Sequence, residues 1–424
     1  MIFSILFLCL NLDFSENKRR ILLNNPYNFH RIKGNWLIII AIIMVASTLR
    51  APLTSVGPVI NDIIHQFNIN DGIAGSLITI PLFIFAIISP LVSKVTNYLS
   101  MSRTILLSTL LLVFSLILRV AGDFTLFILG TILLGVAIAF GNVLLPSYVK
   151  WYFPTQVGIV TGIYSSMMHF TAGLGGGLSI PISSASQFGF RLSLSYWVIF
   201  AIISIFLWIL IVKKNSKLER KTAFVNQRNK ENKTNIVKSR IAWIIAATMG
   251  FQAMIIYTIV MWMPSILIDK GVDSSTAGFL FMLNQFSQVP MTFIVPIIAY
   301  KLSNQRILAI IITTLFLLGF SFLFSHSLIL LFIGVIISGA AMGACFSFCM
   351  ILFSLKARTD NGSVTLSGFG QSIGYLIGAI GPVLVGYLYD ITHSWNSGIV
   401  ALFIMALLFL IFSYSASKNR VIED

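Results

Sequence analysis

The sequence predicts an all-α membrane protein in which twelve transmembrane helices form two six-helix halves that repeat one another. Three observations support this fold class. Of the 424 residues, 57% are hydrophobic and only 10% are charged, whereas about 25% of the residues in an ordinary soluble domain are charged. Apolar segments recur along the chain, and small residues of the first half reappear in the second half at a nearly constant spacing. This composition excludes a soluble globular domain.

The apolar segments define the elements in chain order. A helix needs about 20 apolar residues to cross the hydrocarbon core of a bilayer, and a polar, basic stretch separates the sixth segment from the seventh. The predicted spans are 36–60, 73–96, 104–121, 124–148, 157–182, 190–213, 241–268, 277–300, 306–325, 327–355, 362–388 and 396–416.

Lysine and arginine are distributed unevenly between the two sides of these spans. With both termini inside, as an even number of spans requires, 24 of the 28 basic residues lie inside. Arg119, Arg191 and Lys270 lie outside, and Arg50 falls within a span. Because cytoplasmic loops are enriched in basic residues, both termini are predicted to be cytoplasmic. Topology and contact with anionic lipid head groups then account for the net charge of +15, and no nucleic acid partner is needed.

The chain is therefore expected to divide into five regions. These are a cytoplasmic N-terminal segment over 1–35, a first six-helix half over 36–213, a basic cytoplasmic linker over 214–240, a second six-helix half over 241–416 and a cytoplasmic tail over 417–424.

The two halves show signs of internal duplication. A shift of 204 residues aligns small residues across four spans, and a shift of 207 aligns Trp36 with Trp243. Parallel repeats of this kind enclose a central binding site near the bilayer midplane in many transporters. The aligned pairs are Gly130 with Gly334, Gly135 with Gly339, Ala137 with Ala341, Gly158 with Gly362, Thr161 with Thr365 and Gly177 with Gly381.

Two strings of the first half carry a resemblance to a known family. One is Leu-Arg-Ala-Pro-Leu-Thr-Ser-Val-Gly-Pro over 49–58, and the other is Gly-Asn-Val-Leu-Leu-Pro over 141–146, followed by Lys150 and by Phe-Pro over 153–154. They resemble the CynX/NimT-like branch, the cyanate and 2-nitroimidazole transporters of the major facilitator superfamily. The resemblance covers 36–416 and implies the major facilitator fold and secondary transport of a small polar or anionic solute.

The short loops after the second and eighth spans agree with this resemblance. They keep Lys94 and Arg103 in the first half and Lys301 and Arg306 in the second half, as basic positions of a cytoplasmic-loop motif. The acidic residue that usually accompanies them is missing. Its absence argues against the usual charge–dipole latch of that loop but not against the fold.

Arg50 is the main candidate for binding the solute. At about 1.5 Å per residue from Trp36 it lies roughly 21 Å into a core of about 30 Å, and no acidic residue lies at similar depth in any span. A buried guanidinium usually faces a cavity or a partner. The alternatives are a structural ion pair and a side chain that reaches outward to the interface. An unpaired Arg50 would donate two aligned hydrogen bonds to a carboxylate, cyanate or nitro group.

Other polar residues near the midplane complete the predicted site. His169 could take up a proton, donate to the solute or simply bond to a neighbouring helix, so proton coupling stays open. Gln252, Gln285, Gln288 and Gln371 are expected to line the same cavity; the alternative for each amide is a hydrogen bond between helices.

Prolines and glycines indicate where helices bend or approach closely. Pro52 and Pro58 remove backbone donors and loosen the first span, while Asn142 and Pro146 are expected to shape a gate or a helix contact. The glycines of the fifth and eleventh spans are expected to let the two halves pack closely as they move. They are Gly173, Gly175, Gly176, Gly177, Gly370, Gly374 and Gly378.

The remaining expectations concern partners and competing functions. No phosphate-binding loop and no Cys/His cluster is present, so no cofactor, ATP coupling or metal is expected. The partners are then a small-molecule solute, a possible coupled proton and the lipid bilayer of the cell membrane, and the protein is expected to be a monomer. The alternatives are a multidrug efflux transporter of the same fold and a nontransporting membrane sensor. An enzyme is not expected, because no catalytic cluster lies within the membrane.

Overall fold

The computed structural model describes residues 35–69, 71–96, 98–228 and 236–423. Residues 1–34 and 229–235 lie outside the described residues, and with them most of the predicted N-terminal segment and part of the predicted linker. Within the described ranges all regular elements are helices.

The first half consists of eight α-helices and one short 3₁₀ helix. They are α3 (Trp36–Thr54), η1 (Gly57–Val59), α4 (Ile60–Phe67), α5 (Asp71–Val95), α6 (Met101–Leu118), α7 (Phe124–Tyr152), α8 (Val157–Ser184), α9 (Phe190–Ser195) and α10 (Val198–Arg228).

The second half begins with a 3₁₀ turn and continues with seven α-helices. They are η2 (Ile236–Lys238), α11 (Arg240–Asp269), α12 (Ser274–Lys301), α13 (Arg306–Phe322), α14 (Leu328–Leu355), α15 (Asp360–Gly378), α16 (Ile380–Thr392) and α17 (Trp395–Ala416).

These helices correspond to the twelve predicted spans. Nine helices of the described residues are long and apolar enough to cross a membrane, and α13 and the apolar part of α5 are shorter. The fifth span is α8, which has 28 residues and is rich in glycine and serine. The first span is interrupted, because α3 ends at Thr54 and a 3₁₀ turn containing Pro58 follows. The eleventh span divides into α15 and α16, and α10 stays helical past the predicted end of its span at 213.

The internal repeat is visible in how the helices cross. A Cβ atom at Gly130 would lie 2.9 Å from the carbonyl oxygen of Ser115, so α7 touches the backbone of α6 there. A Cβ at Gly334 would lie 2.9 Å from the carbonyl oxygen of Gly319, so α14 touches α13 in the same way. Both residues of the first contact are related to those of the second by the shift of 204. The two halves therefore share a packing pattern as well as a spacing of small residues.

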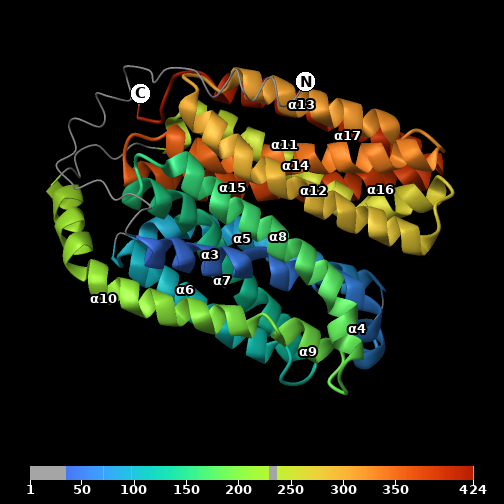
Figure 1. Cartoon of the computed structure of the whole chain (residues 1–424), viewed down its shortest axis with the longest axis horizontal. Coiled ribbons are helices and arrows are strands. Elements are labelled where there is room, and N and C mark those ends of the chain that lie inside the picture. The colour runs from blue at the N-terminus through green and yellow to red at the C-terminus, as the bar shows by residue number, and fades with distance from the viewer. Residues whose placement is uncertain (1–34, 70, 97, 229–235, 424) are drawn as a thin grey trace.

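The two halves lie side by side, with α3–α10 in the lower part of Figure 1 and α11–α17 in the upper part. They meet mainly where α8 packs against α12 and where α5 packs against α15. The end of the bundle at which α10 ends and α11 begins is called the linker end here, and the other end the far end. The linker end also holds the junction between α14 and α15 and the C-terminus (Figure 1).

One prediction about glycines is wrong. A Cβ at Gly370, Gly374 or Gly378 would contact Phe353, Met249 or Ala253, which all belong to the second half. These glycines therefore let α15 pack within its own half and not against the other half. For the fifth span the prediction holds at Gly173 and Gly177, where a Cβ would lie 2.9 Å from Phe286 and 3.5 Å from Met282 of α12, but not at Gly175, where it would meet Thr54 and Ala51 of the first half. Two further glycines also lie between the halves: a Cβ at Gly158 or Gly162 would lie 2.7 or 2.5 Å from carbonyl oxygens of α12.

Candidate functional site

Arg50 lies between the two halves. Its side chain is half-buried near the end of α3, and its Cζ atom lies 4.3 Å from the ring centroid of Phe346, which comes from α14 of the second half. Among the described residues, no carboxylate pairs with Arg50 and none accepts a hydrogen bond from its guanidinium. The side chain thus faces the interior of the bundle. The Phe346 ring lies against its charge, and within the described ranges no protein group accepts a hydrogen bond from its N–H groups.

His169 on α8 touches the same ring from another side. The His169 ring is 1% exposed, and its centroid lies 4.9 Å from that of Phe346 in an edge-to-face arrangement. The Nδ1 atom lies 2.9 Å from the carbonyl oxygen of Ser165. Because a carbonyl only accepts, Nδ1 carries the hydrogen in the neutral ring. Nε2 is then an acceptor, and it is buried without a partner.

Three further aromatic residues, which the sequence did not single out, surround this pair. Tyr375 of α15 lies 5.1 Å from Phe85 of α5 and 6.4 Å from Tyr257 of α11, measured between ring centroids. The charge of Arg50 acts electrostatically on Tyr257 and Tyr375 as well as on His169. The repeat could have found one of them, because the shift of 207 places Tyr257 at the position equivalent to Arg50.

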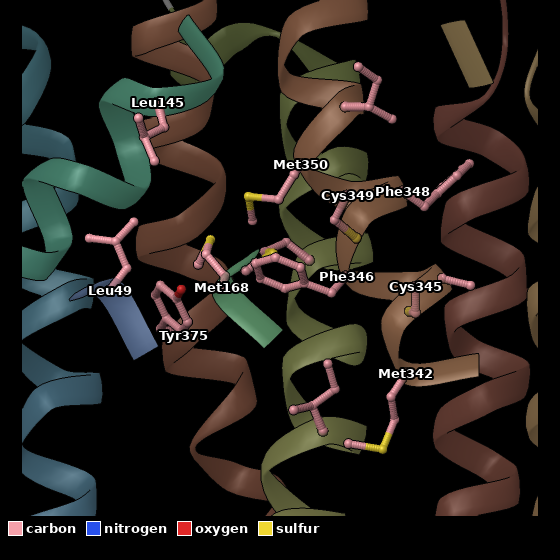
Figure 2. Close-up of a cluster of buried hydrophobic side chains, with 14 of the residues drawn as sticks. Leu49, Leu145, Met168, Met342, Cys345, Phe346, Phe348, Cys349, Met350 and Tyr375 are labelled. Carbon is pink, nitrogen blue, oxygen red and sulfur yellow. The ribbon is translucent and has the colours of Figure 1, made fainter. Parts of the chain in front are cut away.

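Figure 2 shows the buried cluster to which Phe346 belongs. The ring is 2% exposed and shares this cluster with Leu49, Met168 and Tyr375, which come from α3, α8 and α15. Cys345 and Cys349 of α14 lie beside it as buried free thiols. Side chains of both halves therefore contribute to the buried cluster that contains Phe346.

Gln371 connects the two halves directly. Its amide nitrogen donates to the carbonyl oxygen of Asn142 at 3.1 Å and to Ser367 Oγ at 2.9 Å. Within α7 the Asn142 carbonyl has no helical donor, because the residue four positions on is Pro146, which lacks an N–H. Gln371 of α15 satisfies that carbonyl. Asn142 and Pro146 thus take part in a contact between helices.

The other three amides have different surroundings. Gln288 donates to Gln285 Oε1 at 2.7 Å, so these two residues of α12 form one polar unit. Gln252 is 2% exposed, and no contact within the described residues links it to Arg50. The Oε1 atoms of Gln252, Gln288 and Gln371 are all buried without a donor. Unpaired buried acceptors are costly.

The linker end is closed by contacts between α7 and the junction of α14 with α15. Lys150 Nζ donates to the carbonyl oxygens of Ala357 and of Thr359, the latter at 3.3 Å. Ser354 Oγ donates to the Pro146 carbonyl at 3.0 Å. The hydroxyl oxygens of Ser147 and Ser363 lie 3.4 Å apart. These contacts hold helices of both halves together at the linker end.

The C-terminal tail adds to this closed end. The Glu423 carboxylate accepts the backbone N–H of Arg358 at 3.0 Å and that of Thr359 at 3.2 Å, at the start of α15. Lys356 Nζ donates to the Lys418 carbonyl at 2.7 Å. Glu423 also interacts electrostatically with Lys150 of the first half. The tail therefore folds onto the segment that α7 touches.

Pro52 and Pro58 shape the end of α3 beside Arg50. The Val56 N–H bonds to the Leu53 carbonyl and leaves the Pro52 carbonyl without a helical donor. Arg119 Nη1 donates to this carbonyl at 2.9 Å. Pro58 lies in the first turn of η1. The bend near Arg50 is thus held by a hydrogen bond from α6.

The basic residues of the loop motif lie at the linker end. Lys94 and Arg103 are exposed, Lys301 is half-buried, and the Cζ atom of Arg306 lies 4.9 Å from the ring centroid of Tyr414. Within the described part of the chain, no group of three or more His, Cys, Asp or Glu side chains could hold a metal ion.

Twelve membrane-spanning helices in two repeated halves, with a cation enclosed between them, define a membrane transporter. The sequence model of the Major Facilitator Superfamily matches residues 36–382, and the chain belongs to this superfamily. The predicted fold class is therefore confirmed. The family consists of transporters and not of enzymes, so the protein is a multi-pass membrane transporter whose partners are a small-molecule solute and the membrane.

Similar proteins place the chain in the CynX/NimT-like branch. It is 35% identical over 401 residues to the uncharacterized transporter YycB of Bacillus subtilis, covering 94% of this chain and 97% of YycB. It is 29% identical to the 2-nitroimidazole transporter of Escherichia coli, covering 92% and 98% of the two chains. It is 22% identical to the cyanate transport protein CynX of Escherichia coli, covering 84% and 91%.

A solved structure agrees with the fold. The proton:xylose symporter XylE superposes with a TM-score of 0.73 at 14% identity, covering 92% of this chain and 98% of XylE.

Proposed function

We propose that this protein is a secondary transporter that moves a small anionic or polar solute across the cell membrane by alternating access, with Arg50 as the anchor for the solute. The solute class is cyanate-like, carboxylate-like or nitroimidazole-like. The observation that carries the proposal is the surroundings of Arg50. A guanidinium lies between the two halves over an aromatic ring, and no carboxylate of the described residues pairs with it.

The chemistry of Arg50 supports this solute class. The guanidinium carbon of Arg50 lies over the Phe346 ring, which accepts no conventional hydrogen bond, so the planar set of N–H donors is left available. Cyanate, carboxylate and nitro groups all present electronegative atoms that accept such bonds. The relatives named for 2-nitroimidazole and cyanate support the same class. The unpaired acceptors at His169 Nε2 and the glutamines would receive any N–H or O–H group of the solute.

The contacts between halves support alternating access. At the linker end α7 packs against both α14 and α15, whereas α3 and α11, which carry Arg50 and Tyr257, do not pack extensively against each other. The distribution of basic residues favours a cytoplasmic linker end and cytoplasmic termini. With that orientation, the structure corresponds to a state closed toward the cytoplasm. Because both halves of one chain form the site, a monomer suffices.

Uptake by reconstituted protein tests the proposal. Proteoliposomes containing the wild type should take up labelled cyanate or 2-nitroimidazole. Arg50→Gln should reduce uptake by at least about tenfold, because the paired donors are lost. Arg50→Lys should recover only part of it, because an ammonium lacks the planar fork. Arg240→Gln is the matched control, since Arg240 is exposed at the first residue of α11.

Four other results of transport and binding measurements would each contradict a different part of the proposal. Unchanged uptake by Arg50→Gln at equal expression would remove the anchor role. Saturable binding of either solute without flux would favour a membrane sensor, and export of lipophilic cations would favour multidrug efflux. Uptake that is independent of external pH in the wild type and in His169→Ala would argue against proton coupling through this histidine.

A further inference from the structure

The geometry points to Phe346 as a positioning residue for Arg50. The guanidinium carbon of Arg50 lies over this ring, 4.3 Å from its centroid. Because an aromatic ring accepts no conventional hydrogen bond, the N–H groups stay available to the solute. This inference rests on the proposed role of Arg50 as the anchor, and it assigns a specific task to an aromatic residue of the opposite half.

The ring is itself held in place. Phe346 is 2% exposed, and the His169 ring stands edge-to-face against it at 4.9 Å. The His169 ring is fixed in turn by its hydrogen bond to the Ser165 carbonyl in the same helix. The guanidinium carbon of Arg50 therefore lies over a ring that its neighbours hold in place.

The type of partner decides what Arg50 can still do. A carboxylate would occupy two N–H groups of the guanidinium and neutralise its charge. An aromatic ring attracts the cation through its face and accepts none of these hydrogen bonds. Phe346 can therefore stabilise a buried charge without removing its capacity to bind an anion. Within the described residues, Phe346 is the aromatic residue whose ring lies against Arg50.

The repeat supports a dedicated role for this position. The shift of 204 relates Phe346 on α14 to Asn142 on α7, and both positions make contacts between the halves. Asn142 receives the amide of Gln371 from α15, and Phe346 receives Arg50 from α3 and His169 from α8. Of these two equivalent positions, the one in the second half, which contacts Arg50, is aromatic, and the one in the first half is an asparagine.

Stepwise fluorination of the Phe346 ring separates positioning from packing. Fluorine atoms withdraw electron density from the ring face and weaken its attraction for a cation, while the ring keeps nearly the same size. Mono-, di- and trifluorinated phenylalanine would be inserted at position 346 by nonsense suppression in the full chain. Uptake of labelled cyanate and of 2-nitroimidazole by proteoliposomes gives KM and kcat for each variant.

We expect KM to rise with each added fluorine, to about tenfold for the trifluorinated ring, with kcat changed much less. Phe346→Leu should raise KM by at least as much, and Phe346→Trp should keep it near the wild-type value because an indole also attracts cations. The same fluorinated series at Phe348 is the matched control. Phe348 is fully buried two residues away on α14, and its ring packs against Phe409 and no cation among the described residues.

Several results would overturn the inference, and Arg50→Gln separates failure of the positioning role alone from failure of the proposed function. If KM stays flat across the fluorinated series while Arg50→Gln abolishes uptake, Phe346 is a packing residue and the proposed function stands. If Arg50→Gln leaves uptake unchanged, or if the wild type takes up neither solute, the proposed function fails and the positioning role fails with it. An equal rise of KM in the Phe348 series would also reject a specific effect on Arg50.

Discussion

Arg50 and Arg119 are both arginines in largely buried surroundings, but their guanidinium groups are used differently. Arg119 is 2% exposed, donates to the Pro52 carbonyl at 2.9 Å and lies 5.0 Å from the ring centroid of Phe127. The Arg119 guanidinium thus bonds to the backbone, whereas no acceptor for the Arg50 guanidinium lies among the residues that the structure describes. This difference separates a structural cation from one that can bind a solute.

The other two basic residues predicted to lie outside are also held by the protein. Arg191 donates to the carbonyl oxygens of Val120 and Gly122, each at 2.9 Å. Lys270 donates to Asn396 Oδ1 at 2.7 Å. These exceptions to the inside bias of basic residues have structural roles, because each joins two segments of its own half.

Substitution of Arg119 should mainly reduce stability, whereas substitution of Arg50 should mainly reduce uptake. Arg119→Gln should lower the free energy of unfolding by about 1.5–3 kcal/mol, because a hydrogen bond from a charged group to a buried carbonyl is lost. Arg50→Gln should lower it less and should impair uptake far more. Thermal unfolding in detergent and uptake by proteoliposomes would be measured for both variants. Equal losses of stability would show that the Arg50 site is also structural.

His169 should act through its Nε2 atom. Gln places a polar atom near the position of Nε2, whereas Asn reproduces only the position of Nδ1. We expect His169→Asn to raise KM for a solute with an N–H group, such as 2-nitroimidazole, by about tenfold, equivalent to about 1.4 kcal/mol. His169→Gln should raise it less. The two variants should not differ for cyanate, which has no hydrogen to donate, and a difference there would contradict the acceptor role.

Lys356 should make stability depend on pH at the linker end. Burial lowers the pKa of its ammonium from 10.5 to about 8 in the folded protein. Between these two values the unfolded chain binds more protons than the folded protein, so the free energy of unfolding should rise with pH over this range. Below about pH 8 both states are protonated and the full cost of burial is present. The melting temperature of the wild type should therefore rise relative to that of Lys356→Met from pH 8 to pH 10. A constant difference between the two proteins would reject this assignment.

The charged and titratable residues of the candidate site could be predicted from the sequence, but its aromatic residues could not. Charged and titratable residues are rare within membrane spans, so Arg50 and His169 stand out in the sequence. Phe346 and Tyr375 do not, because the chain has 35 phenylalanines and 12 tyrosines, and most such residues pack against lipid or other helices. Which aromatic ring meets the cation depends on what lies across the interface between the halves, and this information is not local.

At the scale of elements, α15 has a carboxylate at its start that comes from the end of the chain. Glu423 accepts two backbone N–H groups and the Thr359 hydroxyl there. Negative charge is favourable at a helix N-terminus, where N–H groups are unpaired. Because Lys150 of α7 donates to the same segment, the tail supports the surface on which the first half rests.

Glu423→Gln should therefore loosen the linker end. A cysteine introduced at Ser147, in a background without native cysteines, should react several-fold faster with a membrane-impermeant maleimide applied from the linker side. The cause is the weakening of the hydrogen bonds from Arg358 and Thr359 when a charged carboxylate is replaced by a neutral amide. Asp123→Asn is the matched control, because Asp123 caps α7 at the far end by accepting the Leu126 N–H. An equal acceleration in both variants would point to general destabilisation.

The helices themselves were largely predictable, but their neighbours were not. Apolar length predicts the spans because a helix must cover the hydrocarbon core. A glycine in a membrane helix predicts that another helix packs closely there, but it does not identify that helix. For this reason Gly370, Gly374 and Gly378 were wrongly assigned to the interface between the halves. A hydrophobic run also conceals breaks such as the turn at η1, because Pro58 fits the first turn of a new helix as well as a bend.

At the scale of the whole molecule, the repeat fixes the fold but not the conformational state. The same two halves can close at either end while each keeps its internal packing. The state therefore depends on a few contacts between the halves, such as Gln371 with Asn142 and Lys150 with Ala357. The sequence contains these residues but gives no sign of their pairing, because each pair is separated by more than 200 positions and by the linker.

A reversible cross-link at the linker end tests whether this closure belongs to the transport cycle. Ser147 and Ser363 have their hydroxyl oxygens 3.4 Å apart on α7 and α15, so cysteines at both positions, with the native cysteines replaced, should form a disulfide on mild oxidation. If the halves must separate there to release the solute, oxidation should stop uptake, and reduction should restore it. Binding measured by thermal shift should persist in the oxidised form, because the bond holds the linker end closed and leaves the far end free. The single-cysteine variants control for effects of the oxidant, and full uptake by the cross-linked protein would show that the linker end need not open.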